Sequence, residues 1–478
     1  MRRIFSIVFV TLMTVGAVLI AEHVTSPTPP EFATSLRPGT PRVPNVDGAI
    51  STTWYCGGVP ALGMSESGEY GGEVVVTNQA ELPATGSVTV LSIDQPPLTV
   101  PLAVEPRAQT TVDLDELLKG NYVSAVVEVD QPGATVEQRS LHPAGNAVST
   151  CANTTSSEWY LADASTPQGS DSRLLITNPY QSPAIVDIAV STSDGPRTPN
   201  ELQGYVVPPQ SLRVVNLEES GFRDEPVLGV SVVASSGRVV VASDQHFLGG
   251  GRLGHVTTLA APALGDEWWF ADGEKGSGVT ERLVMFNPTD HDIEVDVIVL
   301  GVSDAVVDPT TLTVPSREVV VFDTAGIVGL PDGLHGTLVS TLSESSLVVE
   351  RVLTRPTNDS IATSVLLGAG GSALSPEWFV SITPTVAAEG ALLLMNVSPN
   401  LASIDVFSIG PGGREPIPGM EGLQLAANGI LSLDLVDDVD IGRPVVVVSD
   451  QPILVERRLE RNSSGAGRAA VLGLPVDR

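Results

Sequence analysis

The sequence predicts an all-β protein with four tandem immunoglobulin-like β-sandwich repeats after an N-terminal transmembrane or signal helix. Three observations support this fold class: a composition suited to strands and turns, one long apolar segment at the N-terminus, and a motif that recurs four times. Among 478 residues there are 46 Gly and 37 Pro, with 4% aromatic and 17% charged residues. Hydrophobic residues make up 42%, which is enough to bury sizeable cores.

The N-terminus carries an export signal. Two arginines precede the apolar segment at residues 4–21, which is close to the length that spans a bilayer. Cleavage after Ala21 would place the bulky Leu19 where signal peptidases prefer a small residue. We therefore expect residues 1–24 to form a signal anchor that leaves a single-pass protein in the cell membrane, with its C-terminal part extracytoplasmic. A cleaved signal and a secreted protein are the alternative. Residues 25–51, rich in Pro, Ser and Thr, form an extended spacer.

The tryptophans define an internal repeat. All five lie in four motifs, which begin 105, 109 and 110 residues apart at Trp54, Trp159, Trp268 and Trp378. A fixed period of this length indicates repeated structural units. The four predicted β repeats cover residues 52–158, 159–267, 268–377 and 378–478.

Each repeat contains the same series of strand signals. An apolar run ends in Asn at residues 73–78, 173–178, 282–287 and 392–396. Asn caps a turn, and the prolines that follow cannot continue a strand. Next come a Val-x-Pro turn, whose proline the fourth repeat lacks, and an alternating strand. A pair of β-branched runs then predicts a hairpin (residues 125–139 in the first repeat), and a closing strand ends the repeat. About seven or eight strands per repeat indicates a sandwich. The alternative is a continuous solenoid or ring whose units share strands.

The two cysteines both belong to the first repeat. Cys56 lies in its opening strand and Cys151 in its closing strand. Two cysteines cannot form a zinc site unaided, whereas they fit one disulfide in an oxidising compartment. Such a bond requires the two strands to be neighbours, which favours separate units, and would stabilise the fold by roughly 4 kcal/mol.

The charged and reactive residues argue against nucleic-acid binding and catalysis. The net charge of -31 repels phosphate backbones. Six histidines are present. His246 and His255 could together bind a metal ion, and the alternative is that both simply lie in loops. His142 and His246 lie at equivalent positions of the first two repeats. No nucleophile elbow, P-loop or zinc-protease motif occurs, so we predict a non-enzyme with no catalytic, cofactor-binding or metal-binding residues.

Two sets of repeated residues could form contacts. Glu137, Glu350 and Glu456 occupy one register, and Arg351 and Arg457 follow two of them. This repetition predicts carboxylate–guanidinium pairs at a sheet edge or at a joint between units. The four motif tryptophans either plug a joint, cap the sandwich or stack on the sugar rings of a glycan.

The repeated motifs resemble a known family. WYLAD (159–163), LLITNP (174–179), EWWFADG (267–273) and LVMFNP (283–288) are similar to a repeat of secreted actinobacterial proteins that often reads WYFAEG. Together with the anchor and the spacer, they resemble an actinobacterial envelope family classed as a domain of unknown function. The resemblance covers nearly the whole exported part. It implies a cell-envelope location, and the proximity of relatives to envelope glycosyltransferase genes implies surface-polysaccharide biology.

These observations predict a non-enzymatic, membrane-tethered extracytoplasmic scaffold or adhesion-type protein of the actinobacterial cell envelope. The alternative is a polysaccharide-binding accessory protein that works with an envelope glycosyltransferase. The expected partners are the membrane, through residues 4–21, and envelope polysaccharide or envelope proteins.

Overall fold

Strands make up nearly all of the regular structure. The computed structural model describes residues 39–43, 51–66, 68–302, 307–358, 360–381, 388–434, 443–461 and 468–476. In these residues the only α-helix is the short α3 (Leu114–Leu117), and no helix is long and apolar enough to cross a membrane. The all-β prediction is confirmed. The predicted anchor (1–24), most of the spacer (25–51) and His23 lie outside the described residues.

The first unit consists of two sheets. The strands of one sheet, in spatial order, are β1 (Thr52–Ala61), β7 (Gly120–Val129), β4 (Ala84–Ser92) and β5 (Leu98–Val104). Those of the other are β6 (Ala108–Asp113), β3 (Gly68–Asn78), β8 (Ala134–Leu141) and β9 (Ala147–Thr150), with β2 (Gly63–Ser65) also paired to β3. The strand order differs from that of an immunoglobulin constant domain, whose first two strands share a sheet. Here the chain changes sheets between β1 and β3.

The second and third units repeat this arrangement. The second has β10 (Glu158–Ala164), β16 (Leu228–Ser236), β12 (Ala184–Thr192), β13 (Gly195–Arg197) and β14 (Tyr205–Val207) in one sheet, and β15 (Ser211–Asn216), β11 (Asp171–Asn178), β17 (Val240–Phe247) and β18 (Gly254–Leu259) in the other. One sheet of the third unit consists of β27 (Ala369–Gly370), β19 (Glu267–Lys275), β24 (Gly333–Thr341), β21 (Ile293–Leu300) and β22 (Thr310–Val314). Its other sheet consists of β23 (Glu318–Asp323), β20 (Thr280–Asn287), β25 (Val348–Pro356) and β26 (Ile361–Leu367).

In the fourth unit one long strand, β34 (Val445–Arg461), belongs to both sheets and joins them into a single nine-stranded sheet. Its N-terminal half pairs with β28 (Ser375–Val380) and β30 (Ala402–Gly410), and its C-terminal half pairs with β29 (Ala388–Asn396) and β35 (Arg468–Leu472). The remaining strands are β31 (Gly413–Pro416), β32 (Leu423–Leu425), β33 (Ile430–Asp434) and β36 (Leu474–Pro475).

The predicted hairpin is wrong. Its two runs form β7 and β8 in the first unit, and these strands lie in different sheets and do not pair with each other. In the fourth unit the equivalent runs are continuous within β34, so the chain bends from one sheet into the other instead of reversing. Polar residues between two apolar runs indicate a change of direction, but they do not specify which strand becomes the partner.

Burial follows the position of each sheet. In β12, the buried Ala184, Val186 and Ile188 alternate with partly exposed residues, as expected for a strand with one face in a core. In β11, by contrast, residues 174–178 are all buried. This strand packs on its own core with one face and against the first unit with the other. Burial of both faces explains why the sequences of the Asn-ended strands are continuous apolar runs and not alternating ones.

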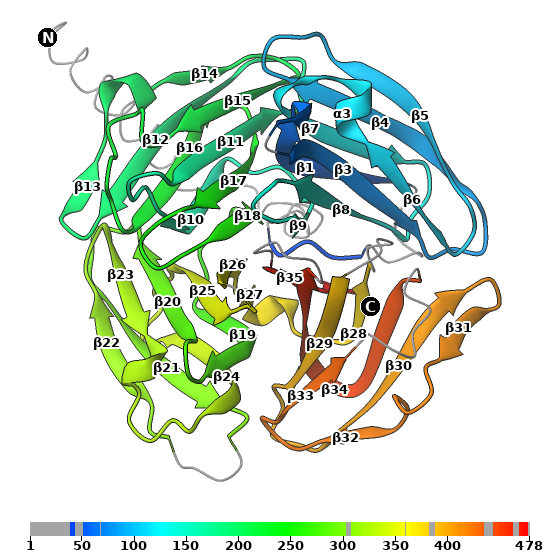
Figure 1. Ribbon diagram of the computed structural model, residues 1–478, viewed down its shortest axis with the longest axis vertical. Coiled ribbons are helices and arrows are strands. Elements are labelled where there is room, and N and C mark those ends of the chain that lie inside the picture. The colour runs from blue at the N-terminus through cyan, green and yellow to red at the C-terminus, as the bar shows by residue number, and fades with distance from the viewer. Residues whose placement is uncertain are drawn as a thin grey trace, which may run out of the picture. The chain divides into compact units, whose positions relative to one another are not determined.

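The four units surround a common centre (Figure 1), where the closing strands β9, β18, β26 and β35 lie. β9 contacts β18 and β35, and β26 contacts the same two strands, so the contacts form a closed cycle. Every described ladder between named strands joins strands of one unit. Isolated bridges also occur, and one of them, Val43 to Val476, pairs the segment before β1 with the last described residue of the chain. The sequence left open separate sandwiches or a ring whose units share strands. The structure is a ring, but its units do not share strands.

Candidate ligand-binding site between the first two units

The four motif tryptophans lie inside their units. Their exposed fractions are between 0% and 5%. Each indole Nε1 donates to a backbone carbonyl at the point where the chain passes between sheets, at 2.9 to 3.1 Å, the acceptors being Ala134, Val239, Leu347 and Ile453. Because the surrounding core covers both indole faces, stacking on a glycan is ruled out for these residues. The tryptophans anchor the crossover of each sandwich.

The Asn that ends each apolar strand is buried and bonded rather than simply a turn residue. In the third unit the Asn287 side-chain amide lies 2.8 to 3.1 Å from the carbonyl oxygens of His291, Val314 and Pro315. Asn78, Asn178 and Asn396 make the same three contacts in their own units. The amide therefore ties two loops together, and one of them is the loop that carries the Val-x-Pro signal in the first three units.

The recurring glutamates lie at the joints between units, as predicted. Glu456 of the fourth unit pairs with Arg351 of the third, and its carboxylate accepts from the backbone N–H groups of Ala271 and Asp272. Arg457 of the fourth unit donates to Glu137 of the first at 2.8 Å, which places an equivalent pair at the closure of the ring. All four ionic side chains are at least 95% buried. The prediction of carboxylate–guanidinium pairs is confirmed for these two joints.

The joint between the second and third units has the carboxylate without the guanidinium. Glu350 accepts from the N–H groups of Ala162 and Asp163 at 2.8 and 2.6 Å. Ser243 occupies the register that holds Arg351 and Arg457 in later units. Burial and the neighbouring Asp163 raise the pKa of Glu350 to about 8.

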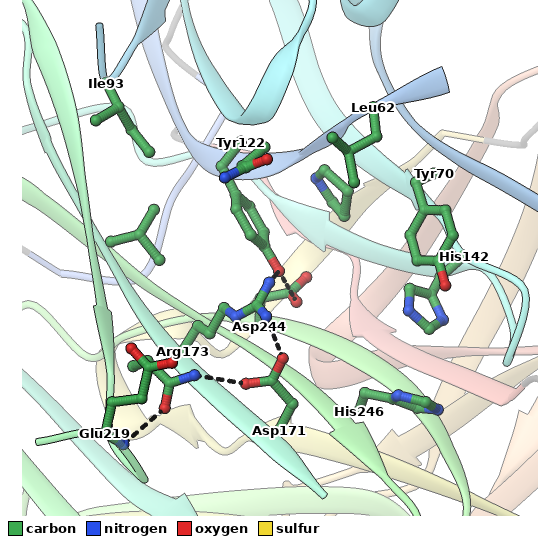
Figure 2. Close-up of a pocket in the computed structure, with 14 residues that line it drawn as sticks. Leu62, Tyr70, Ile93, Tyr122, His142, Asp171, Arg173, Glu219, Asp244 and His246 are labelled. Carbon is green, nitrogen blue, oxygen red and sulfur yellow. Dashed lines mark hydrogen bonds and ion pairs between the residues drawn. The ribbon is translucent and has the colours of Figure 1, made fainter. Parts of the chain in front are cut away.

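The joint between the first and second units has neither group. Ala242 replaces the glutamate and faces Gly57, where an added Cβ would lie 2.3 Å from the Ala242 methyl carbon. Only glycine allows the strands this approach. A cavity of about 590 Å³ lies at the same joint (Figure 2).

The floor of the cavity is a chain of hydrogen bonds that crosses the joint. The hydroxyl of Tyr122, from the first unit, donates to Asp244 Oδ1 at 2.9 Å and accepts from Arg173 Nη1 at 2.8 Å. Arg173 also pairs with Asp171, and the Asn216 amide donates to Asp171 at 3.2 Å. Burial and Asp244 raise the pKa of Tyr122 well above its usual value. The phenol therefore stays protonated and holds two charged groups in place.

Three histidines meet beside this chain. His142 stacks on His255 with ring centres 4.4 Å apart and planes 13° apart, and lies 4.7 Å from His246. Burial, His255 and His246 lower the pKa of His142 to about 3, and burial and His255 lower the pKa of His246. His142 and His246 are therefore neutral at neutral pH. His255 Nε2 lies 2.9 Å from Asp244 Oδ2. Burial acts to raise the pKa of Asp244, but the contacts of its carboxyl group with His255 and Tyr122 together outweigh burial and lower that pKa.

This cluster is not arranged as a metal centre. The described residues include no group of three or more His, Cys, Asp or Glu side chains that could hold a metal ion. The lone pairs of imidazole lie in the ring plane, so the stacked rings of His142 and His255 do not converge on one ion. His246 and His255 are directly opposite each other on β17 and β18, but Nε2 of His255 is already used by Asp244.

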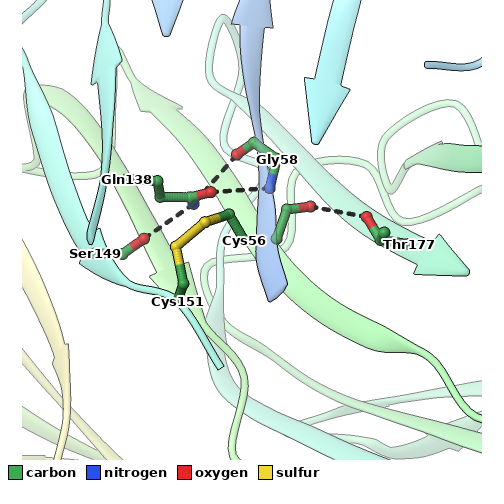
Figure 3. The surroundings of a disulfide bond; sticks show 7 residues. Cys56, Gly58, Gln138, Ser149, Cys151 and Thr177 are labelled. Atoms are coloured by element: carbon green, nitrogen blue, oxygen red, sulfur yellow. Dashed lines mark hydrogen bonds between the residues drawn. A yellow bond between two sulfur atoms is a disulfide. The ribbon is translucent and has the colours of Figure 1, made fainter. Parts of the chain in front are cut away.

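The predicted disulfide is present close to this joint. Cys56 and Cys151 are bonded, with their Cα atoms 4.3 Å apart (Figure 3). Beside the bond, Gln138 accepts from the Gly58 N–H at 3.1 Å and donates to Ser149 at 2.9 Å. The disulfide thus holds in place the strand that packs against the second unit.

Sequence reasoning missed most of the cavity. Arg173 begins the repeated run at residues 173–178, but Tyr122, Asp171 and Asp244 belong to no repeated motif. The available signal was that His142 and His246 fall within one residue of the same position in adjacent repeats, since His246 corresponds in register to Leu141. Repetition shows what every unit requires, so a site made by one particular joint appears only as a departure from the repeat.

Comparison with known proteins gives a family but no activity. No curated protein matches this chain. One solved structure, described as "Biofilm associated protein - BSP domain", is 9% identical, with 91% of this chain and 97% of that chain covered, at a TM-score of 0.15. That score supports no inference about fold or function. A family model matches residues 129–263 and 251–473, most of the chain, and the protein belongs to this family of unknown function, DUF5719.

Proposed function

We propose that this chain is a non-enzymatic, membrane-tethered extracytoplasmic scaffold or adhesion-type protein of the cell envelope, in which four immunoglobulin-like repeats form one rigid display unit. The observation that carries this proposal is the role of the repeated residues. The tryptophans, the strand-ending asparagines and the joint glutamates are all buried and bonded to their own fold. The residues that recur from unit to unit therefore serve to maintain the fold.

The charged groups Asp244 and Arg173 of the cavity also favour a non-catalytic role. Both carboxylate oxygens of Asp244 are engaged, one by Tyr122 and the other by His255. Arg173 is held by Tyr122 and Asp171. A general base or nucleophile needs a reactive atom free to reach a substrate, and these groups are occupied by one another.

A second candidate function is a polysaccharide-binding accessory protein that works with an envelope glycosyltransferase. The cavity between the first two units favours it, because a pocket of about 590 Å³ with both apolar and polar walls has the size and character of small-ligand sites.

A tagged full-length chain in its native host tests the first proposal. We expect it in the membrane fraction, digested by protease added outside spheroplasts, with no free thiol under non-reducing alkylation. Recovery of a protease-resistant, cytosolic chain with two free thiols would overturn it. Pull-down against purified envelope polysaccharide and against extracted envelope proteins separates the two candidates, since retention of isolated polysaccharide supports the second.

A further inference from the structure

We propose that the cavity between the first and second units binds a neutral, polyhydroxylated ligand such as a terminal sugar unit of a glycan. This inference rests on the second candidate function and assigns it a site. The tryptophans, where aromatic stacking was expected, play no part in it.

The cavity exists only because two units meet. The first unit contributes Tyr70, Tyr122 and His142, and the second contributes Asp171, Arg173 and His246. This is also the joint where Ala242 replaces the repeated glutamate, so the carboxylate that recurs at the other joints is missing from that register. The same register is occupied by buried ion pairs at two of the other joints. The first joint has thus lost a structural contact and has a cavity lined from both sides.

The charged groups that line the cavity already have partners, which argues against an ionic ligand. Arg173 is paired with Asp171, and Asp244 is held by Tyr122 and His255. An anion at Arg173 would have to compete with Asp171 in a partly exposed ion pair. A cation at Asp244 would have to displace partners that are buried with it, and an uncompensated buried charge is costly. Glu219 lies exposed at the rim, where water solvates it. A neutral ligand can bind without breaking either pair.

The histidines provide neutral hydrogen-bonding groups. The Ala144 N–H donates to His142 Nδ1 at 3.1 Å, so the proton of this neutral ring lies on Nε2. His246 lines the cavity, and no hydrogen bond to its ring is seen among the described residues. His142 therefore has a donor available to a ligand, and the neutral ring of His246 has one donor and one acceptor, which together match a hydroxyl group. The exposed amide of Asn121 adds both kinds of group at the rim.

The remaining walls are apolar. Pro60, Leu62, Ile93 and Val214 lie around the same cavity. A sugar ring presents C–H groups on its faces and hydroxyl groups on its edge, so it matches walls that are partly apolar and partly hydrogen-bonding. A purely apolar ligand would leave the imidazole groups without partners, at a cost comparable to a lost hydrogen bond.

A charge-matched ligand series tests the proposal. The full chain in detergent is titrated with glucose, galactose, mannose, maltose and lactose, and with glucosamine and glucuronate as cationic and anionic counterparts, using saturation-transfer NMR. We expect binding of at least one neutral sugar and weaker binding of its charged counterparts. His246→Phe keeps the ring shape but removes both nitrogens, and we expect it to weaken binding about tenfold. His291→Phe, at an exposed histidine of the third unit, is the matched control and should bind normally.

Three results would overturn this assignment: no neutral sugar binds, a charged counterpart binds more tightly, or His246→Phe binds as well as the wild type. If His246→Phe does not fold, Asn121→Ala replaces it, because that exposed side chain contributes little to stability. Retention of isolated polysaccharide by both the wild type and His246→Phe would reject the site while leaving the second candidate function intact.

Discussion

Glu350 provides a sharp test of the joint energetics. One of its oxygens accepts from the N–H groups of Ala162 and Asp163, and the other has no hydrogen-bond partner among the described residues. Ser243 stands where an arginine would neutralise the charge. Replacing the glutamate by glutamine keeps an oxygen for the two N–H groups and removes the ionisable proton. We expect Glu350→Gln to make the protein more stable than the wild type at alkaline pH.

The size of the effect follows from the raised pKa. Burial, with Asp163 as the next cause, moves the pKa from 4.5 to about 8. Between these values the folded state binds more protons than the unfolded state, so the free energy of unfolding falls as pH rises. A shift of this size corresponds to about 5 kcal/mol, fully developed above pH 8 and absent below the unfolded pKa. The glutamine variant lacks this contribution.

The assay is urea unfolding of both proteins at pH 4, 7 and 9, followed by tryptophan fluorescence, since every unit has a buried tryptophan at its crossover. Hydrogen exchange at the amides of Ala162 and Asp163 reports on the same joint locally. The difference in unfolding free energy between variant and wild type isolates Glu350 from the many other titrating groups.

The matched control is Glu456→Gln at the next joint. Burial raises the pKa of Glu456, and the guanidinium of Arg351 opposes that rise. Removing this carboxylate leaves Arg351 buried without its partner, which should destabilise the protein by about 3–5 kcal/mol. If Glu350→Gln is no more stable than the wild type at pH 9, or if the two substitutions act with the same sign there, the reasoning about the missing arginine is wrong.

Other substitutions test the repeated contacts by calorimetry. Replacing Cys56 and Cys151 by Ala removes a cross-link between residues 95 apart in sequence and should lower the free energy of unfolding by about 4 kcal/mol. An unchanged melting temperature would show that the disulfide does not stabilise the fold. Asn287→Ala leaves three loop carbonyls without their donor and should cost about 3 kcal/mol, against little change for Asn400→Ala at an exposed loop side chain of the fourth unit. Trp159→Ala should cost about 4 kcal/mol through the cavity it creates, and a loss below 1 kcal/mol would contradict a core role.

The repeat could be recognised in the sequence because every unit needs the same types of residue at the same places to form its strands and turns. Trp159 and its counterparts marked the start of each unit, and the Asn-ended runs marked the strand that is buried on both faces. The pairing of Glu456 with Arg351 was also predictable, since a buried charge that recurs in one register requires a partner. The hairpin could not be predicted correctly, because residues 125–139 specify two strands and a change of direction but not the sheet to which each strand belongs.

The sequence by itself determined that this is an all-β chain of repeated units with one pair of bonded cysteines, because those properties depend on local patterning and on residues that recur. Only the tertiary structure decided that the units close into a ring, that the tryptophans are buried, and that the first joint has a cavity. These depend on contacts between residues far apart in sequence, such as Tyr122 with Asp244 and His142 with His255. Each of these contacts occurs once and does not recur in the other units, so a search for repeated patterns in the sequence could not predict it.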